Sequence, residues 1–252
     1  MHLLSQIPGY KSASQLARVM TETWTREHIF CPNCGSPISE YENNRAVADF
    51  YCGNCREEFE LKSAKKNTVG NKIVDGAYHT MIARLGEAQN PNFYFLNYTP
   101  SYEVKNFIVI PKHFFTPSII EKRPPLPETA RRAGWVGCNI LLTTIPESGK
   151  IYYIENGKQK SKQEVLDTWQ KTIFLRETKN TEAKGWLLDI MNCIESLGKR
   201  DFSLDEMYDF TPRLQLLHPE NNFVQDKIRQ QLQVLRDKGY LEFVSRGRYR
   251  KL

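Results

Sequence analysis

The sequence has no apolar run long enough to cross a membrane. Its longest apolar runs, such as Phe107–Ile110, have the length of a β-strand, whereas a membrane-spanning helix needs about 20 consecutive apolar residues. The N-terminal residues also lack a basic start followed by an apolar stretch, so we expect no signal peptide. These absences predict a protein of the cytoplasm that has no membrane partner.

The sequence also has no internal repeat, no low-complexity segment and little excess charge. Its formal net charge is +6 and its pI is near 8.9, which permits a polyanionic partner but favours one only mildly. Hydrophobic residues make up 40% and aromatic residues 12% of the chain, so global disorder is excluded and a packed core is expected. At 252 residues, the chain can form one substantial domain and a smaller one.

The six cysteines are not spaced like a disulfide framework. Cys31 and Cys34 form one C-x2-C pair, Cys52 and Cys55 form another, and seventeen residues separate the two pairs. Four thiolates at this spacing are typical of a tetrahedral zinc site, and a closed shell of four sulfurs leaves no position for a substrate. The spacing therefore predicts a structural zinc ion, with redox pairs or disulfide bridges as the less favoured alternative.

Other small residues accompany these pairs. Gly35 and Gly53 are expected to ease the two tight turns that carry the cysteines. Cys138 and Cys193 are isolated in the sequence, so we expect them to be small buried side chains.

Helices and strands alternate in the first two-thirds of the chain. Apolar residues at helical spacing predict a helix over residues 12–30 and another over residues 72–85, with Asp75 favouring the start of the second helix. Short aromatic and β-branched runs predict strands over residues 46–52, 57–63, 92–98 and 106–112, and a strand that enters an Asn156-Gly157 turn. This order predicts an α/β fold with a mixed (α+β) sheet.

A polar stretch over residues 176–185 is expected to link this domain to a second one. Beyond it, the sequence predicts three helices and then two short strands around an Arg-Gly-Arg turn. The predicted helices span residues 186–197, residues 203–210 with a cap at Ser203, and residues 221–239. This order of elements is that of a winged helix-turn-helix.

The third of these helices has an apolar face and a polar face. The core-facing stripe consists of Val224, Ile228, Leu232 and Leu235. The polar face consists of Asp226, Arg229, Gln230 and Gln233. Arg and Gln side chains make paired hydrogen bonds to base edges in the major groove, so this face is a candidate DNA reader, with a solvated face as the alternative. The predicted wing carries basic residues expected to contact phosphates, namely Arg246, Arg248, Arg250 and Lys251.

A carboxylate and lysine set overlaps the second cysteine pair. Alternation along a strand puts Glu60 and Lys62 on one face and Phe59 on the other. Asp49 and Glu60 would supply oxygen ligands to Mg²⁺, and Lys62 would orient a metal-bound water or stabilise negative charge. The D-x(n)-E-x-K pattern is short, so a charged surface strand is the alternative. Glu22 on the first helix is expected to be a surface residue, with a water-mediated metal contact as the alternative.

Several longer segments resemble the DpnI-type methyl-directed restriction endonucleases. The segments that carry the resemblance are "CPNCG", "ENNRAVADFYC", "CREEFELKS", "TARRAGW", "KIRQQLQVLRDK" and "RYRKL". The resemblance covers nearly the whole chain. It implies a PD-(D/E)XK nuclease domain over residues 1–181, with a zinc-binding insertion at about residues 29–58, and a winged helix domain over residues 182–252.

The resemblance also implies an activity and a site. Members of this family cut duplex DNA at GATC when the adenine carries an N6-methyl group, and the match gives Asp49, Glu60 and Lys62 the nuclease roles described above, with Mg²⁺ as catalytic cofactor and Zn²⁺ as structural ion. Ala48 stands where the motif usually has proline. Both domains are implied to read the site, with Arg131 and Arg132 on phosphates or bases.

Trp135, in the same segment as Arg131 and Arg132, is expected to offer an apolar surface to a methyl group, with a core tryptophan as the alternative. We also expect a methyl-sensing pocket near the start of the third C-terminal helix, and a monomer. Two other functions stay open: a zinc-containing winged-helix transcription regulator without nuclease activity, and a nuclease that has lost its methyl dependence.

Overall fold

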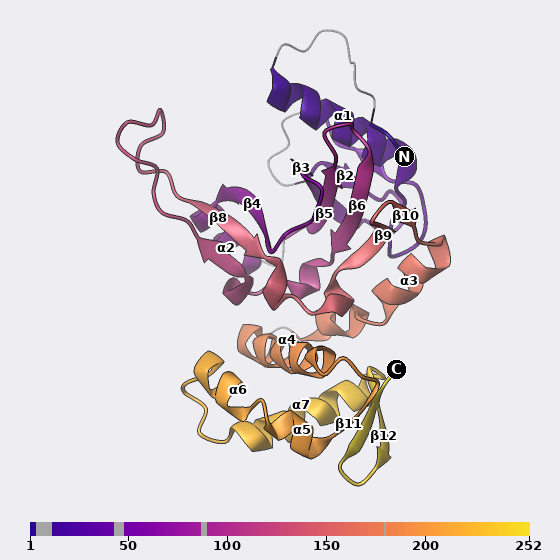
Figure 1. Ribbon diagram of the computed structural model, residues 1–252, viewed down its shortest axis with the longest axis vertical. Helices are drawn as coiled ribbons and strands as arrows, with labels where there is room; N and C mark the ends of the chain where they lie inside the picture. The colour runs from indigo at the N-terminus through magenta and orange to yellow at the C-terminus, as the bar shows by residue number, and fades with distance from the viewer. Residues whose placement is uncertain (4–11, 43–47, 87–89, 179) are drawn as a thin grey trace. The chain divides into compact units, whose positions relative to one another are not determined.

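The computed structural model describes residues 1–3, 12–42, 48–86, 90–178 and 180–252 (Figure 1). The chain folds into two compact units: the first comprises Met1–Thr143 and Ser148–Gln170, and the second comprises Thr144–Glu147 and Lys171–Leu252. The domain boundary expected after residue 181 stays a prediction. Ala46 and Val47, where a strand was expected to begin, lie outside the described residues, as does Lys179 of the expected linker.

The first unit is built on a seven-stranded mixed sheet. Its strands, in their order across the sheet, are β1 (Ser39–Glu40), β2 (Phe50–Tyr51), β3 (Glu58–Lys65), β5 (Asn92–Tyr98), β6 (Val104–Ile110), β9 (Ile151–Glu155) and β10 (Lys158–Gln159). β3 and β5 run parallel, and every other neighbouring pair is antiparallel. Every residue of β5 is buried, as expected for a central strand that is covered on both faces. The predicted mixed α/β fold is confirmed.

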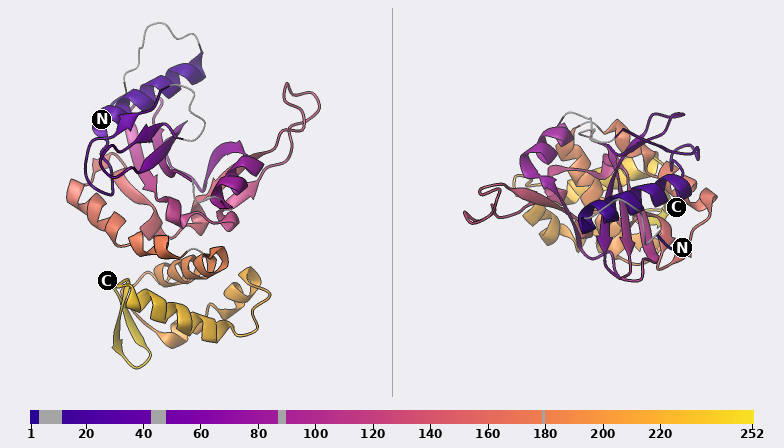
Figure 2. Two further views of the ribbon diagram at one scale, coloured as in Figure 1. Left: turned by 180° about the vertical axis from the view of Figure 1, so that it is seen from behind. Right: turned by 90° about the horizontal axis from the view of Figure 1, so that it is seen from above.

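Helices α1 (Ala13–His28) and α3 (Lys162–Gln170) pack against this sheet (Figures 1 and 2). Trp24 of α1 is buried, and its ring centroid lies 5.7 Å from that of Phe107 on β6. Trp169 of α3 is buried as well, and its indole N–H donates to the side-chain oxygen of Asn33 at 3.0 Å. The helix predicted over residues 12–30 is therefore present and covers the sheet with its apolar stripe.

A second, three-stranded sheet stands beside the first. It consists of β4 (Lys72–Ala77), β8 (Gly137–Leu141) and β7 (Ile120–Lys122), all antiparallel. The helix expected over residues 72–85 is wrong in its first half, because only α2 (Tyr78–Gly86) is helical. Ile73 and Asp75 are buried and Val74 is 62% exposed, so side chains alternate as in a strand, and β4 takes its hydrogen bonds from β8, far along the chain.

The turn after β9 matches its sequence signature. Asn156 and Gly157 both adopt positive φ, 50° and 81°, which is the conformation of a type I′ hairpin turn. β9 and β10 pair directly across it. Short 3₁₀ helices complete the connections, at Lys112–Phe114, Pro117–Ile119, Leu142–Thr144, Glu147–Gly149 and Ile173–Glu177.

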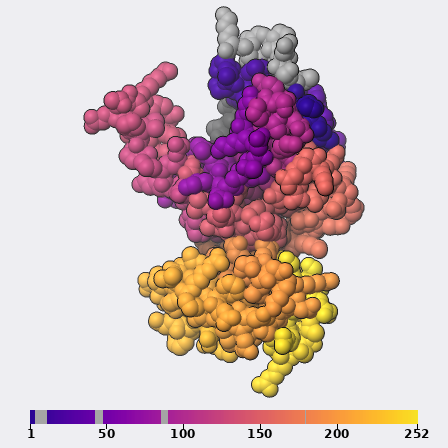
Figure 3. All heavy atoms as spheres, viewed as in Figure 1, coloured from indigo at the N-terminus to yellow at the C-terminus, as the bar shows by residue number. Residues whose placement is uncertain are grey.

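Residues 123–136 form an arm that joins β7 to β8. The arm stands clear of the rest of the first unit in Figure 3, where it is pink. Its two sides are held together by backbone hydrogen bonds: the N–H of Leu126 donates to the carbonyl of Trp135 at 2.9 Å, and the N–H of Gly134 donates to the carbonyl of Leu126 at 3.0 Å. The arm is thus a hairpin-like excursion from the small sheet.

The second unit is a helix-turn-helix with a small sheet. Its elements are α4 (Thr181–Ser196), β11 (Asp201–Ser203), α5 (Leu204–Tyr208), α6 (Thr211–Leu217), α7 (Val224–Asp237), β12 (Leu241–Ser245) and β13 (Arg248–Lys251), with sheet order β11, β13, β12. The predicted apolar stripe of α7 is buried throughout. The Ser203 cap is present as a capping box with Glu206.

Three parts of this unit differ from the sequence prediction, and one of them is the third strand of the small sheet, β11, which was not predicted. α4 begins at Thr181, inside the stretch expected to be a linker, because the Asn180 side chain accepts from the N–H of Ala183 and caps the helix. α6 was not predicted, although Pro212 in its first turn is a signal for a helix start. Within the part of the chain described above, none of the helices is long and apolar enough to span a membrane.

Candidate active site and metal centre

The two cysteine pairs sit on two turns of the same design. In the first, the N–H of Cys31 donates to the carbonyl of Ser36 and the N–H of Gly35 donates to the carbonyl of Cys31, both at 2.8 Å. The second turn repeats both bonds, from Cys52 to Glu57 and from Arg56 to Cys52, at 2.8 and 2.9 Å.

The fourth residue after the first cysteine of each pair adopts positive φ. In the first turn this residue is Gly35, at 72°, and in the second it is Arg56, at 61°. Gly53 was expected to ease the second turn, but the left-handed position belongs to Arg56, so that expectation is wrong.

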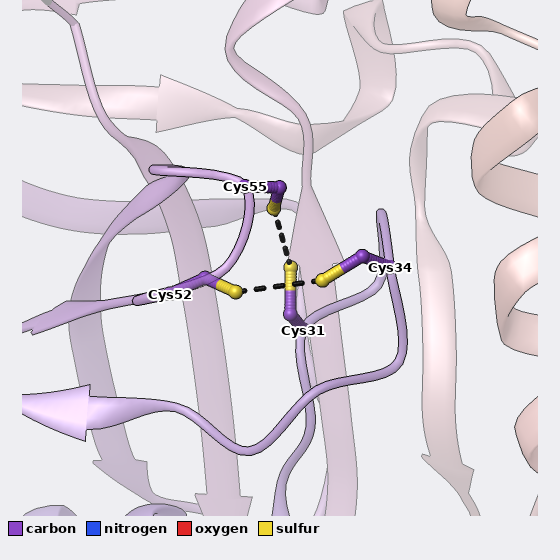
Figure 4. Close-up of side chains that lie close together, drawn as sticks. All are labelled: Cys31, Cys34, Cys52 and Cys55. Carbon is purple, nitrogen blue, oxygen red and sulfur yellow. Dashed lines mark hydrogen bonds between the residues drawn. The ribbon is translucent and has the colours of Figure 1, made fainter.

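The four thiols converge (Figure 4). Cys31, Cys34, Cys52 and Cys55 have all four Sγ atoms within 4.8 Å of one another, and the Cys31–Cys55 and Cys34–Cys52 pairs are both at 3.4 Å. A tetrahedral zinc site with bonds of about 2.3 Å holds its sulfurs about 3.8 Å apart, so the cluster has the dimensions of such a site. Burial raises the pKa of the Cys31 thiol, and a bound cation is what makes four thiolates stable together. The cluster can hold a metal such as zinc.

Glu60 and Lys62 project from the same face of β3. The ammonium of Lys62 lies 2.6 Å from Oε1 of Glu60. The other carboxylate oxygen of Glu60 lies 3.3 Å from a guanidinium nitrogen of Arg84, which comes from α2. Phe59 points the other way, is fully buried and stacks on Tyr94 at 4.4 Å between ring centroids. The alternation predicted for this strand is therefore present.

Asp49 is fastened to the same strand. Its backbone N–H donates to the carbonyl of Phe59 at 2.9 Å, and its Oδ2 accepts the backbone N–H of Leu61 at 2.7 Å. Asp49 directly precedes β2, which pairs antiparallel with β3 and has Phe50 opposite Phe59. The Asp49 carboxylate is thus fixed to β3 at Leu61, the residue between Glu60 and Lys62.

A third carboxylate, Asp75, joins this group from β4. It forms an ion pair with the ammonium of Lys62, and its side chain is 5% exposed. Asp75 was expected to favour a helix start, which is wrong because the residue lies in a strand. Its local sequence carries no signal for the contact, since β4 meets β3 only in the folded chain.

The charges of the group are set by burial and by one another. Burial raises the pKa of Glu60, and the positive charges of Lys62 and Arg84 oppose this rise. Burial alone would lower the pKa of Lys62, but the carboxylates of Glu60 and Asp75 outweigh it and raise that pKa. Lys62 is therefore a cation at neutral pH, and a further cation near Glu60 would favour its ionised form.

A cleft of about 510 Å³ opens beside Lys62, between α1, β3 and β4. Its lining includes the basic residues Arg18, Lys66 and Lys72. Glu22 also lines it, with its side chain 9% exposed and Oε1 only 2.6 Å from the guanidinium of Arg18. The expectation of a surface glutamate is wrong, and burial raises the pKa of this carboxyl.

Comparison with protein families identifies the chain. A model described as the DpnI Dam-replacing family matches residues 1–178, and a model described as the Dam-replacing helix-turn-helix domain matches residues 182–251. The chain belongs to the DpnI Dam-replacing family. This membership points to a restriction endonuclease, and the helix-turn-helix domain indicates DNA binding.

In this DpnI-family chain, the polar face predicted on α7 is exposed. Asp226, Arg229, Gln230 and Gln233 are all exposed, and Asp226 forms an ion pair with Arg229 one turn away. Phe223, just before α7, is 72% exposed, and sequence reasoning did not single it out. An exposed aromatic residue at the start of a predicted recognition helix is the signal that could have identified it.

The basic residues of the small C-terminal sheet, which the DpnI family model also covers, differ in exposure and in ion pairing. Arg246 and Arg248 are exposed. Arg250 instead lies 2.7 Å from Asp201 and 3.8 Å from Glu242, both on neighbouring strands of the small sheet. Its charge is already paired within the domain, so Arg246 and Arg248 are the freer candidates for phosphate contacts.

The arm of the first unit carries the other predicted DNA-binding residues. Arg131 and Arg132 are exposed, and the guanidinium of Arg132 lies 4.8 Å from the Trp135 ring centroid. Trp135 is half-buried and folds back over Gly137, where an added Cβ would come within 2.8 Å of the indole. Trp135 is therefore neither a core residue nor fully exposed: one part of the ring packs on Gly137, where the arm meets β8.

The two remaining cysteines of the DpnI-family chain are structural. Cys138 and Cys193 are 0% and 1% exposed, as expected from their isolation in the sequence. Burial raises the pKa of Cys138 to about 11 and that of Cys193 to about 12, so both stay protonated thiols at neutral pH.

Proposed function

We propose that this chain is a Mg²⁺-dependent type II endonuclease that hydrolyses phosphodiester bonds of duplex DNA at adenine-methylated GATC sites. The observation that carries the proposal is the arrangement on β3: Glu60 and Lys62 lie side by side at 2.6 Å, and the carboxylate of Asp49 accepts the N–H of Leu61 between them. Membership of the DpnI Dam-replacing family supports it.

Asp49 and Glu60 would hold the Mg²⁺. Two carboxylates from adjacent strands are the hard oxygen donors that this ion takes, while water and phosphate oxygens fill its other positions. When bound there, the ion lowers the pKa of a water molecule and neutralises charge on the phosphate. The raised pKa of Glu60 supports this assignment, because a cation relieves the cost of burying its negative charge.

Lys62 would donate to the attacking water and to the phosphate oxygen on which negative charge grows. Its raised pKa keeps it a donor under the conditions of the reaction. Arg84 would orient Glu60, since it holds the oxygen that Lys62 does not contact. Arg18, Lys66 and Lys72 in the adjoining cleft would attract the DNA backbone.

The four-cysteine cluster would hold a structural zinc ion. Its four sulfurs form a closed shell with no room for a substrate. We assign the ion to folding: it fixes two turns of the hairpin region that also carries Asp49.

Both units would read the methylated site. One methyl group gives only about 0.8 kcal/mol of transfer energy, so strong discrimination needs several apolar contacts and penalties for the unmodified base. Trp135 on the arm and Phe223 at the start of α7 are the apolar residues we assign to this contact. Arg131, Arg132, Arg246 and Arg248 would bind phosphates or bases, and the polar face of α7 would read base edges.

Plasmid cleavage tests this function directly. We expect the chain, as a monomer with Mg²⁺, to cut plasmid from an adenine-methylating host and to spare plasmid from a host without that methylation. Cleavage of neither plasmid would favour a zinc-containing winged-helix regulator, and equal cleavage of both would favour a nuclease without methyl dependence.

The catalytic assignment needs its own variant. Glu60→Ala should abolish cutting while leaving affinity for a methylated duplex intact. Glu103→Gln is the matched control. Glu103 is a half-exposed glutamate in the connection between β5 and β6, it pairs with Lys105 at 3.3 Å, and it does not line the cleft. Normal cutting by Glu60→Ala, or equal loss in the control, would overturn the assignment.

A further inference from the structure

Asp75 contacts Lys62 of β3 although the two residues belong to different sheets. It lies on β4, whose partners are β8 and β7, whereas Lys62 lies on β3 of the seven-stranded sheet. The register of β4 on β8 shifts between Asp75 and Ala77, which is a β-bulge at Gly76. Bulges redirect the side chains next to them and are enriched beside active sites. The bulge thus accompanies a carboxylate that is aimed out of its own sheet.

Lys62 pairs with two carboxylates that differ in their other contacts and in how deeply they are buried. Glu60 is one of them, and it also contacts Arg84 and is the residue that we assign to the metal. Asp75 is the other, and its side chain is 5% exposed against 17% for Glu60. A buried carboxylate is costly unless it is paired, so Asp75 stays with Lys62 when Glu60 turns to another cation.

We infer that Asp75 is the positioning residue for Lys62. It holds the ammonium at the reacting phosphate, acts through Lys62 alone, and contacts neither DNA nor metal. The inference rests on the function proposed above and adds a residue to it. If Asp75 were merely a structural link between the two sheets, its loss would lower stability and DNA affinity along with activity.

Asp75→Asn keeps the shape of the side chain and removes its charge. Loss of a residue that orients a catalytic group typically costs about 10–100-fold in activity, so we expect the single-turnover rate on methylated duplex to fall by that factor. The dissociation constant for the same duplex, measured without Mg²⁺, should stay within about twofold of the wild type. Asp75→Glu retains the charge and should recover part of the rate.

The matched control is Glu155→Gln. Glu155 lies on β9, pairs with Lys160 at 3.0 Å, and neither residue lines the cleft beside Lys62. This variant removes one carboxylate charge and one ion pair of the first unit without disturbing the Lys62 group, so its cutting rate should be that of the wild type.

A double-mutant cycle separates positioning from structure. Because Asp75 acts through Lys62, adding Asp75→Asn to Lys62→Ala should cause no further loss of rate. A further loss of the same factor, a wild-type rate for Asp75→Asn, or a loss of affinity as large as the loss of rate would each overturn the inference. A wild-type chain that cuts no plasmid overturns the proposed function itself, whereas a cutting wild type with a fully active Asp75→Asn overturns this inference alone.

Discussion

Arg56 occupies a position that favours glycine, and its replacement should stabilise the protein. The two metal-binding turns have the same hydrogen bonds, yet the left-handed residue is Gly35 in one and Arg56 in the other, with φ of 72° and 61°. The Arg56 side chain is exposed, so Arg56→Gly removes little packing. We expect Arg56→Gly to raise the melting temperature of the zinc-loaded chain.

The size of the effect follows from two opposing terms. A left-handed conformation costs an L-residue about 1–2 kcal/mol. Glycine loses more conformational entropy on folding, which reduces the gain in the free energy of unfolding by about 0.5–1 kcal/mol. The net gain is about 0.5–1 kcal/mol, and in a unit of this size each kcal/mol shifts the melting temperature by about 2–4 °C.

Gly35→Ala provides the mirror experiment. It introduces the left-handed cost into the first turn, and its Cβ would displace only the flexible end of the Lys162 side chain, so it should destabilise by about the amount that Arg56→Gly gains. Calorimetry of both variants at full zinc occupancy measures the two shifts. A lower melting temperature for Arg56→Gly, or shifts of the same sign in both variants, would refute the reasoning.

Three further predictions concern charge and metal. The pKa of Glu60 is raised in the folded chain, so without Mg²⁺ its ionisation costs stability as pH rises above its ordinary value of 4.5. Glu60→Gln should therefore melt higher than the wild type at pH 7.5 and lose that advantage at pH 4; an advantage that does not depend on pH would contradict this. Cys52→Ser should lose the metal and several kcal/mol of stability, measured by elemental analysis and melting. An unchanged melting temperature in the metal-free variant would show that the cluster has no structural role. Arg248→Ala should reduce the slope of log affinity against log salt by about one, whereas Arg250→Ala, already paired with Asp201, should change the slope less; equal changes would argue against the distinction.

Features with local causes could be predicted from the sequence. The Asn156-Gly157 turn needs only two residues that tolerate positive φ, and the Ser203 cap needs only Glu206 three residues on. The four-cysteine cluster also follows from spacing, because each pair closes its own turn. In each case the interaction that fixes the structure lies within a few residues of the signal.

Features that depend on distant partners could not be predicted in this way. Residues 72–77 carry apolar residues at helical spacing, but β8 supplies their hydrogen bonds from some sixty residues further along the chain. The contact of Asp75 with Lys62 was missed for the same reason. In the sequence Arg250 cannot be told from Arg246 and Arg248, whereas in the fold it lies beside Asp201 and Glu242. Local propensity cannot anticipate a partner that arrives through tertiary structure.

The overlap of the cysteines with Asp49, Glu60 and Lys62 has a physical reason in the length of β2. This strand has two residues, with Asp49 before it and Cys52 just after it. Glu60 and Lys62, in contrast, lie on an eight-residue strand that is in register with β5 over its last seven residues. A two-residue strand cannot hold its own position, so the metal cluster on one side and the Asp49–Leu61 bond on the other must fix where Asp49 lies. Loss of the cluster metal should therefore displace Asp49 first, while the pair on β3 stays in place.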